Sequence, residues 1–261
     1  MNDIAVLGLG HMGAAIAGRL AAAGYRVTAW NRSPRPPIPG VRHVDDLGSV
    51  DAGVVITMLT DGDAVEAVLA KLAPRAGTVV VDMSTIGPDA VRRIAAGLPA
   101  GVALVDAPVG GSTGAAAAGA LRIFAGGADA DVARVELVLA ALGTVRRCGA
   151  LGTGAAVKLV LNAALVTAVA GLADALTVAA AVGLDREAAV AVLRDGPLGF
   201  ATERTLAPGA PAAHFRVALA AKDADLAIAA AGPDLPMLAA ARTMMARAVP
   251  DDDLSALVRR P

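Results

Sequence analysis

Near its beginning the chain contains Ile4-Ala5-Val6-Leu7-Gly8-Leu9-Gly10-His11-Met12-Gly13, an apolar run that leads directly into three spaced glycines. The run has the length of a short strand, and an alanine-rich stretch of helical composition follows it. Gly8 permits the tight turn, Gly10 lets backbone approach a pyrophosphate, and Gly13 lets the helix pack closely on the sheet. The helix N-terminus offers N–H donors and the positive end of its dipole to phosphate groups. This placement between strand and helix predicts a dinucleotide site rather than a chance glycine turn.

The second predicted strand, residues 26–30, indicates which dinucleotide binds. Sites that prefer NAD usually place Asp or Glu near the end of this strand, where the acid binds the ribose 2′-hydroxyl. Here the chain continues with Asn31-Arg32-Ser33, which contains no carboxylate that would repel a 2′-phosphate. It does contain a guanidinium, which can bind such a phosphate through charge-assisted hydrogen bonds. Arg32 could instead be a solvated loop residue, as arginines often are. Because the acid is missing and a base is present, we expect NADP rather than NAD.

Composition and charge exclude several classes of function. The chain has 261 residues and a formal net charge of −1, so nothing indicates a surface for nucleic acid or anionic lipid. Its single cysteine, Cys148, excludes an intramolecular disulfide and a cysteine-based metal cluster, which suits a reducing compartment. The three histidines, at positions 11, 43 and 214, have no metal-ligand spacing. From this cysteine and these histidines we expect no metal site. We also see no signal peptide, and therefore expect a cytoplasmic protein.

The chain has two regions of different character. Up to about residue 152, short β-branched runs alternate with helical stretches, which is typical of a parallel sheet with helices on both faces. Beyond Gly154 strand signals stop, and helical composition covers residues 154–182, 186–194, 219–231 and 236–248. The segment 196–215 is rich in proline, glycine and polar residues and is predicted to be a loop. We therefore predict an α/β fold with a Rossmann-type sheet domain over residues 1–152 and an all-helical domain over residues 153–261.

The apolar segment 159–182 is long enough to be compared with a membrane span. Polar residues interrupt it at Asn162, Thr167, Asp174 and Thr177, and the rest is mostly Ala, Val and Leu. We expect this segment to be a buried helix of a soluble protein.

Lys158 is the most informative ionisable residue of the second half. It is the only charged side chain between Arg147 and Asp174, on a predicted helix made mainly of Ala, Val and Leu. Because burying an unpaired ammonium is costly, Lys158 must reach water, a partner or a substrate. Asn162 lies one helical turn later on the same face. An ammonium can donate a proton to a carbonyl oxygen while the amide fixes the lysine or a substrate hydroxyl, so the pair suits a carbonyl reaction. A lysine snorkelling from the helix edge is the alternative.

Two polar segments follow the carboxyl ends of predicted strands, the edge at which open α/β sheets bind ligands. Gly110-Gly111-Ser112-Thr113-Gly114 follows the strand at 102–106, and its N–H groups and hydroxyls could hold a carboxylate. An ordinary strand-to-helix turn would have the same composition. Ser84 and Thr85 follow the strand at 78–82 and could touch the nicotinamide ribose or the substrate.

Several motifs in one order resemble those of the β-hydroxyacid dehydrogenases, the group of 3-hydroxyisobutyrate dehydrogenase, tartronate semialdehyde reductase and the glyoxylate/succinic semialdehyde reductases. The motifs are Gly8 to Gly13, Asp82-Met83-Ser84-Thr85-Ile86, Asp106-Ala107-Pro108-Val109 with its glycines, Gly152-Thr153-Gly154 leading to Lys158 and Asn162, and Lys222-Asp223. The resemblance covers nearly the whole chain. It implies a Rossmann domain and a helical domain, joined by a long helix that often takes part in dimer formation.

The resemblance also implies residue roles. Lys158 would be the catalytic acid/base in reversible hydride transfer between the nicotinamide and a carbonyl carbon, and Asn162 its active-site companion. The expected cofactor contacts are Gly8, Leu9, Gly10, His11, Met12, Gly13, Asn31, Arg32, Ser33, Met58, Leu59, Thr85 and Lys222. The expected substrate contacts are Gly110, Gly111, Ser112 and Asp223. Lys222-Asp223 precedes a predicted apolar helix, so Asp223 could instead offset the helix dipole.

Two features depart from the family pattern. The family commonly has Ser-Gly-Gly after Asp-Ala-Pro-Val, whereas this chain has Gly110-Gly111-Ser112. One side-chain hydroxyl is therefore lost or displaced by two positions. The segment 196–215, which in this family helps to close the substrate pocket, looks short and contains prolines at positions 197, 208 and 211. We therefore expect a wider or differently shaped substrate site.

We therefore expect a dehydrogenase that acts on a small hydroxy acid or semialdehyde and forms a homodimer. Two other functions are alternatives to it. Imine reductases resemble the family in fold and cofactor but typically replace the catalytic lysine, so Lys158 argues against that activity. A catalytically silent NADP-binding sensor or scaffold would not need Lys158 and Asn162.

Overall fold

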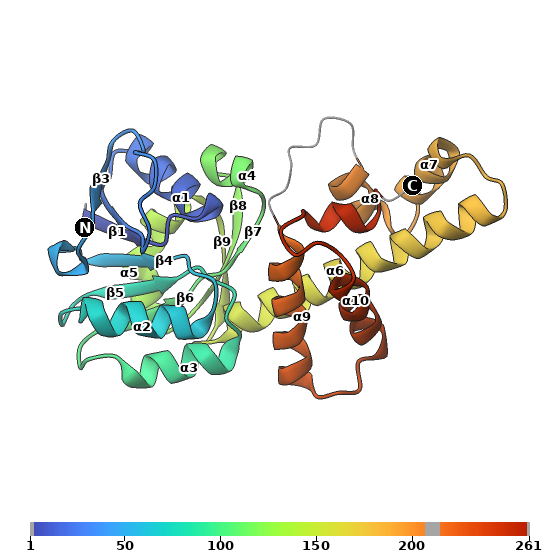
Figure 1. The fold of residues 1–261 in the computed structure, drawn as a ribbon. Coiled ribbons are helices and arrows are strands. Elements are labelled where there is room, and N and C mark those ends of the chain that lie inside the picture. The colour runs from blue at the N-terminus through green and yellow to red at the C-terminus, as the bar shows by residue number, and fades with distance from the viewer. Residues whose placement is uncertain (1–2, 207–214, 260–261) are drawn as a thin grey trace. The chain divides into compact units, whose positions relative to one another are not determined.

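The computed structural model describes residues 3–206 and 215–259, so His214, Pro208 and Pro211 lie outside the described residues. The chain forms two compact units, residues 1–158 and 159–261, which are described separately below (Figure 1). The division falls within the long helix α6, Thr153–Ala181, which contributes residues to both units.

Unit 1 is built on one sheet with the order β3-β2-β1-β4-β5-β6-β8-β7, and β9 pairs with β8. The strands are β1 Asp3–Leu7, β2 Arg26–Trp30, β3 Val41–Val44, β4 Val54–Thr57, β5 Val79–Asp82, β6 Ala103–Asp106, β7 Val109–Gly110, β8 Leu121–Gly126 and β9 Gly143–Gly149. The run from β3 to β6 is parallel, whereas β8 pairs antiparallel with β6 and β7. The chain order reverses at β1, between β2 and β4, and such a switch point is where open α/β sheets bind ligands.

Alternate residues of the central strands pack against helices on the two faces of this sheet. The helices are α1 His11–Ala22, α2 Gly62–Leu72, α3 Pro88–Gly97, α4 Thr113–Ala118 and α5 Asp129–Ala140. Val6 and Ile56 belong to the core that includes residues of α1, α4 and α5. Leu7 and Val55 belong to the core that includes residues of α2 and α3, which lie together on one side in Figure 1. Both faces are covered, which explains why these strands are continuous apolar runs.

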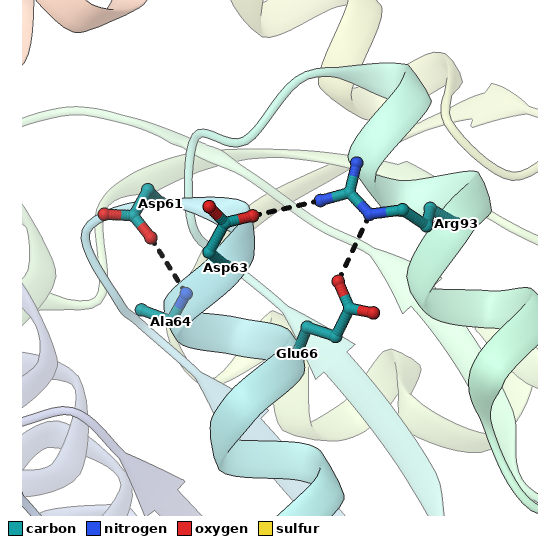
Figure 2. Close-up of polar contacts among 5 residues, drawn as sticks. All are labelled: Asp61, Asp63, Ala64, Glu66 and Arg93. Atoms are coloured by element: carbon teal, nitrogen blue, oxygen red, sulfur yellow. Dashed lines mark hydrogen bonds and ion pairs between the residues drawn. The ribbon is translucent and has the colours of Figure 1, made fainter.

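The N-terminus of α2 contains two acids, Asp61 and Asp63, and an aspartate can cap a helix. Asp61 is the N-cap, and its carboxylate accepts a 2.8 Å hydrogen bond from the Ala64 N–H. Asp63 and Glu66 instead pair with Arg93 of α3, at 3.3 and 3.2 Å (Figure 2). These exposed ion pairs connect the two helices while adding little stability.

The described residues of unit 2 form helices, together with one isolated β-bridge between Arg216 and Asp253. After α6 come α7 Arg186–Asp195, α8 Gly199–Leu206, α9 Val217–Ala231, α10 Pro236–Ala246 and the short 3-10 helix η2 Leu254–Leu257. By length and composition α6 could cross a membrane, with a mean hydropathy of 1.9 and 33% of its most apolar window buried. Its buried residues Val166, Val169, Leu172 and Leu176 recur at helical spacing and belong to the core that α9 and α10 also line. One face of α6 therefore packs into the core of this unit.

The predicted α/β class, a parallel sheet region followed by a helical region, is confirmed. The prediction of a loop over residues 196–215 is wrong for residues 199–206, because α8 occupies Gly199–Leu206, and residues 207–214 lie outside the described residues. The polar residues that suggest a loop are accommodated inside the helix. The Thr202 and Thr205 hydroxyls donate to the carbonyl oxygens of Leu198 and Ala201, at 3.0 and 2.7 Å, which lets both threonines be buried. The short strands β3 and β7 are also not predicted from the sequence.

Candidate active site

The glycine loop between β1 and α1 is shaped by close backbone contacts. Gly8 has a φ of +103°, which side chains rarely adopt, and a Cβ atom there would collide with the Met58 carbonyl oxygen. A Cβ on Gly13 would collide with the Gly8 carbonyl oxygen, so only glycine lets α1 pack this closely. A Cβ on Gly10 would meet nothing within 4 Å, so the space next to Gly10 is open.

This loop fits a dinucleotide pyrophosphate. Gly10 is the N-cap of α1, and no side chain within the described part of the chain caps that helix. The first turn of a helix without such a cap directs its N–H groups, here including those of Met12 and Gly13, to where an anion can bind. The open space at Gly10 lets a phosphate approach them. The residues present thus suit a nicotinamide dinucleotide.

The Asn31-Arg32-Ser33 segment lies directly beside this loop. The Asn31 Oδ1 accepts a 2.8 Å hydrogen bond from the Leu9 N–H, and its Nδ2 donates to the Ser33 carbonyl oxygen at 2.8 Å. Asn31 therefore holds the end of β2 against the glycine loop. The side chains of Arg32 and Ser33 are exposed, so both are accessible to a ligand at this edge.

The strand ends next to the loop are joined by buried hydroxyls. The Leu59 N–H donates to the Ser84 Oγ at 2.9 Å, and the Thr57 hydroxyl donates to Asp82 at 2.7 Å. Ser84 is buried, so its hydroxyl serves the contact between β4 and β5, whereas Thr85 is half-buried. Of the two hydroxyls considered for ligand contact, Thr85 is the more accessible.

Asp106, at the end of β6, anchors the first turn of α6. Its two carboxylate oxygens accept hydrogen bonds from the Gly152 and Ala155 N–H groups, both at 2.7 Å. A Cβ on Gly154 would collide with the Phe124 carbonyl oxygen, so the helix start lies directly on β8. Burial raises the pKa of Asp106 to about 6, although the two N–H groups act in the opposite direction. Lys158 follows Ala155 by three residues, and the Asp106 contacts therefore fix where this half-buried lysine emerges.

Sequence reasoning did not assign Asp106 a role, although the residue lies in a quoted motif. An acid at the end of a buried strand, together with a later Gly-Thr-Gly at a helix start, is the signal that could have identified it.

In unit 2, a buried polar cluster joins α6 to α9. Asn162 is 4% exposed, and its Nδ2 donates to the Asp223 carboxylate at 2.5 Å. The Lys222 ammonium pairs with the other Asp223 oxygen at 2.7 Å. Asp223, an expected substrate contact, is 2% exposed and is directed at these two side chains. The expectation that Lys222-Asp223 precedes a helix is wrong, because both lie inside α9, where Asp223 is too far from the N-terminus to offset the dipole.

The predicted substrate cradle is a strand end, a turn and a helix cap. Gly110 ends β7 and pairs with Arg122 of β8, and Gly111 has a φ of +140°. Ser112 is the N-cap of α4, and its Oγ accepts a 3.2 Å hydrogen bond from the Ala115 N–H. The strand-to-helix turn considered from the sequence is therefore what forms. The Ser112 hydroxyl therefore acts as the N-cap of α4.

Comparisons with known proteins agree with this architecture. Residues 3–154 match the model of the NAD binding domain of 6-phosphogluconate dehydrogenase, and residues 152–260 match that of the NAD-binding domain of NADP-dependent 3-hydroxyisobutyrate dehydrogenase. A 3-hydroxyisobutyrate dehydrogenase of Pseudomonas aeruginosa is 34% identical over 255 residues, covering 88% of this chain and 85% of the relative. A 3-sulfolactaldehyde reductase of Escherichia coli is 30% identical over 273 residues, covering 95% and 90%. The solved structure of Mycobacterium tuberculosis 3-hydroxyisobutyrate dehydrogenase with L-serine has a TM-score of 0.85 at 30% identity, covering 99% and 98%.

The glycine loop at the sheet switch point and the helical second unit define an oxidoreductase that uses a nicotinamide dinucleotide, NADP included. Within that class, the chain belongs to the β-hydroxyacid dehydrogenase family. The resemblance inferred from the motifs is thereby confirmed.

Proposed function

We propose that this protein transfers hydride reversibly between NADP and the carbonyl or hydroxyl carbon of a small hydroxy acid or semialdehyde, with Lys158 as the acid/base. The observation that carries the proposal is the pair of 2.7 Å bonds from Asp106 to the first turn of α6. Through them Lys158 is tied to the carboxyl end of β6, and the glycine loop follows the carboxyl end of the parallel strand β1. Parallel strands present these ends at one edge, where ligands bind.

The bound nicotinamide supplies or accepts the hydride. In reduction, the Lys158 ammonium donates its proton to the carbonyl oxygen as charge develops there, and in oxidation the neutral amine takes the hydroxyl proton. Asn162 follows Lys158 by four residues on the same helix. Because the Asn162 Nδ2 donates to Asp223, the amide offers its Oδ1 to a substrate hydroxyl. A lysine and an oriented amide therefore suit carbonyl reduction.

The preference for NADP is supported by the end of β2. Asn31 is engaged with the Leu9 N–H, while Arg32 is exposed and no carboxylate occurs in Asn31-Arg32-Ser33. A guanidinium there would form charge-assisted bonds to a 2′-phosphate. Arg32→Ala is expected to raise the Kd of NADPH about tenfold and leave that of NADH within about twofold. Equal affinity of the wild type for both cofactors would overturn the NADP preference.

The reaction is tested with purified protein, NADPH and a panel of semialdehydes, 2-oxo acids and cyclic imines. Turnover of carbonyl substrates is expected, and Lys158→Ala should lower kcat by roughly 100- to 10,000-fold. Lys158→Arg keeps the positive charge but cannot release the proton, so it should be similarly slow. Lys71→Ala, at an exposed position of α2, serves as the control and should be unchanged.

The other outcomes select the competing functions. Turnover of cyclic imines alone would indicate an imine reductase. NADPH binding without turnover of any substrate would indicate a silent NADP-binding protein. Unchanged turnover in Lys158→Ala would contradict the acid/base role.

A homodimer and a cytoplasmic location complete the proposal. The homodimer is supported by exposed apolar side chains on α6, where Val160 is 70% and Val178 is 61% exposed. Sedimentation velocity of the wild type should give a dimer, and Val178→Asp should shift it towards monomer. The cytoplasmic location is based on the single cysteine of the chain.

A further inference from the structure

An arginine occupies the space beside the glycine that departs from the family pattern. Arg122 of β8 is the direct partner of Gly110 in the antiparallel β7–β8 pair. Residues paired in this way project their side chains to the same side. A Cβ atom on Gly110 would lie 3.2 Å from Nη2 and 3.4 Å from Nε of Arg122. The guanidinium therefore lies where a side chain at position 110 would extend.

The strand that carries Arg122 also supports the start of α6. Phe124 is two residues further along β8, so it shares the face of Arg122, and it too lies 3.5 Å from a Cβ on Gly110. The first turn of α6 packs on the Phe124 carbonyl at Gly154, one turn before Lys158. Ile123, between them, points into the core beneath α1 and α5. Arg122 therefore faces away from that core, on a strand in contact with the helix start that leads to Lys158.

Arg122 is an exposed residue. No acidic side chain of residues 3–206 or 215–259 forms an ion pair with it. Many other arginines of this chain do pair with acids, as Arg147 of the neighbouring β9 does with Glu136 at 2.9 Å. A guanidinium presents a planar fork of N–H donors that matches two oxygens of a carboxylate or sulfonate.

We propose that Arg122 binds the anionic group of the substrate and thereby sets its class: a hydroxy acid or semialdehyde whose far end is a carboxylate or a sulfonate. This inference rests on the proposed function. Arg122 makes the contact with the substrate anion that a side chain at position 110 makes in the family pattern. The absence of a side chain on Gly110 provides the space that the guanidinium occupies. The acidic end held by Arg122 directs the opposite, carbonyl end towards Lys158.

The test compares Arg122→Ala and Arg122→Lys with wild type on three substrates: a carboxylate semialdehyde, its uncharged methyl ester and the sulfonate analogue. Arg122→Ala should lower kcat/KM for the acids by roughly 10- to 100-fold, mainly through KM, and change that for the ester less than about threefold. Arg122→Lys should recover part of the loss, because it restores charge without the fork. The larger effect identifies carboxylate or sulfonate as the preferred group. The KM for NADPH should not change.

One control variant and one further test variant distinguish a direct role of Arg122 from indirect effects. Arg42→Ala removes an exposed arginine from β3, at the opposite edge of the sheet from β7, and should leave all three substrates unchanged. Gly110→Ser places atoms against the flexible end of Arg122 and should weaken the acids selectively without removing the arginine. An equal loss for acid and ester in Arg122→Ala, or no loss, overturns the proposal.

Failure of the proposed function is recognised separately. If the wild type turns over no substrate, titration calorimetry of 3-hydroxypropanoate into the NADP-saturated protein still tests the site. Binding by wild type that is lost in Arg122→Ala supports the anion contact. Equal binding by both proteins, or none by wild type, overturns it.

Discussion

Two glycine-rich turns at the carboxyl side of the sheet differ in what surrounds them. At residues 8–13 an added Cβ on Gly8 or Gly13 would collide with a backbone carbonyl oxygen, which cannot move without shifting a strand or helix. At residues 110–114 an added Cβ on Gly110 would touch mainly the end of the Arg122 side chain, which can swing away. Gly8 and Gly13 of the first turn are therefore required by backbone packing. In the second turn Gly111 has a φ of +140° that favours glycine, but position 110 can accept a side chain.

This difference fits the two roles proposed for these turns. A pyrophosphate is common to all dinucleotides, and it is bound by backbone N–H groups that any sequence supplies once the glycines are present. A substrate has to be distinguished from similar molecules, which requires particular side chains. We therefore expect substitutions at the first turn to affect folding and cofactor binding, and substitutions at the second to affect substrate choice.

The strongest test of this comparison is Gly13→Ala. The added methyl group would force α1 away from Gly8, and we expect a loss of about 3 kcal/mol or more in the free energy of unfolding, measured with urea. Gly10→Ala is the matched control, since its Cβ meets nothing within 4 Å. That variant should keep its stability but bind NADPH more weakly, by fluorescence titration. Equal stability of both variants would contradict the backbone argument.

A second test concerns Asp106, whose carboxylate binds backbone N–H groups at the start of α6. Burial raises its pKa from the ordinary 3.8 to about 6, so the native state holds this proton more tightly than the unfolded state. The resulting stabilisation is fully present below about pH 4 and is lost as pH rises to about 6, by up to about 3 kcal/mol. Asp106→Asn cannot titrate, so the stability of wild type relative to this variant should fall over that range. A difference that stays constant between pH 4 and 7 would contradict the raised pKa.

The smallest effect is expected for Gly110→Ala. Its Cβ would approach the guanidinium to 3.2 Å, which a small movement of Arg122 relieves, so the free energy of unfolding should change within about 0.5 kcal/mol. Thermal unfolding at equal protein concentration measures it. A loss comparable to that of Gly13→Ala would mean that the second turn is as constrained as the first, and the comparison would fail.

Much of the fold could be predicted because its signals are local. Buried parallel strands such as β4 and β5 are short β-branched runs, and α3 begins at Pro88, a residue suited to the first helical position. The missed elements are short or carry misleading residues. β7 has two residues, and the threonines of α8 are polar but satisfied by the preceding turn. Local composition alone cannot identify such elements.

The candidate site was predicted less completely, because its contacts join distant parts of the chain. Asp106 accepts hydrogen bonds from Gly152 and Ala155, 46 and 49 residues later, and Asn162 donates to Asp223, 61 residues later. No spacing rule connects such pairs. The roles assigned to Lys158 and the other site residues stay predictions until the substitutions are made.

The sequence by itself determined the glycine turn, the succession of a sheet region and a helical region, and the family, because these depend on steric demands within a few residues and on motif order. Only the tertiary structure decided that the Ser112 hydroxyl caps α4, that Asp223 is buried against Asn162 and Lys222, and that Arg122 lies beside Gly110. Each of these depends on which side chains strand pairing and helix packing bring together. The glycine turn at residues 8–13 would be recognisable in any chain, whereas Gly110 acquires a meaning only from the strand that folds against it.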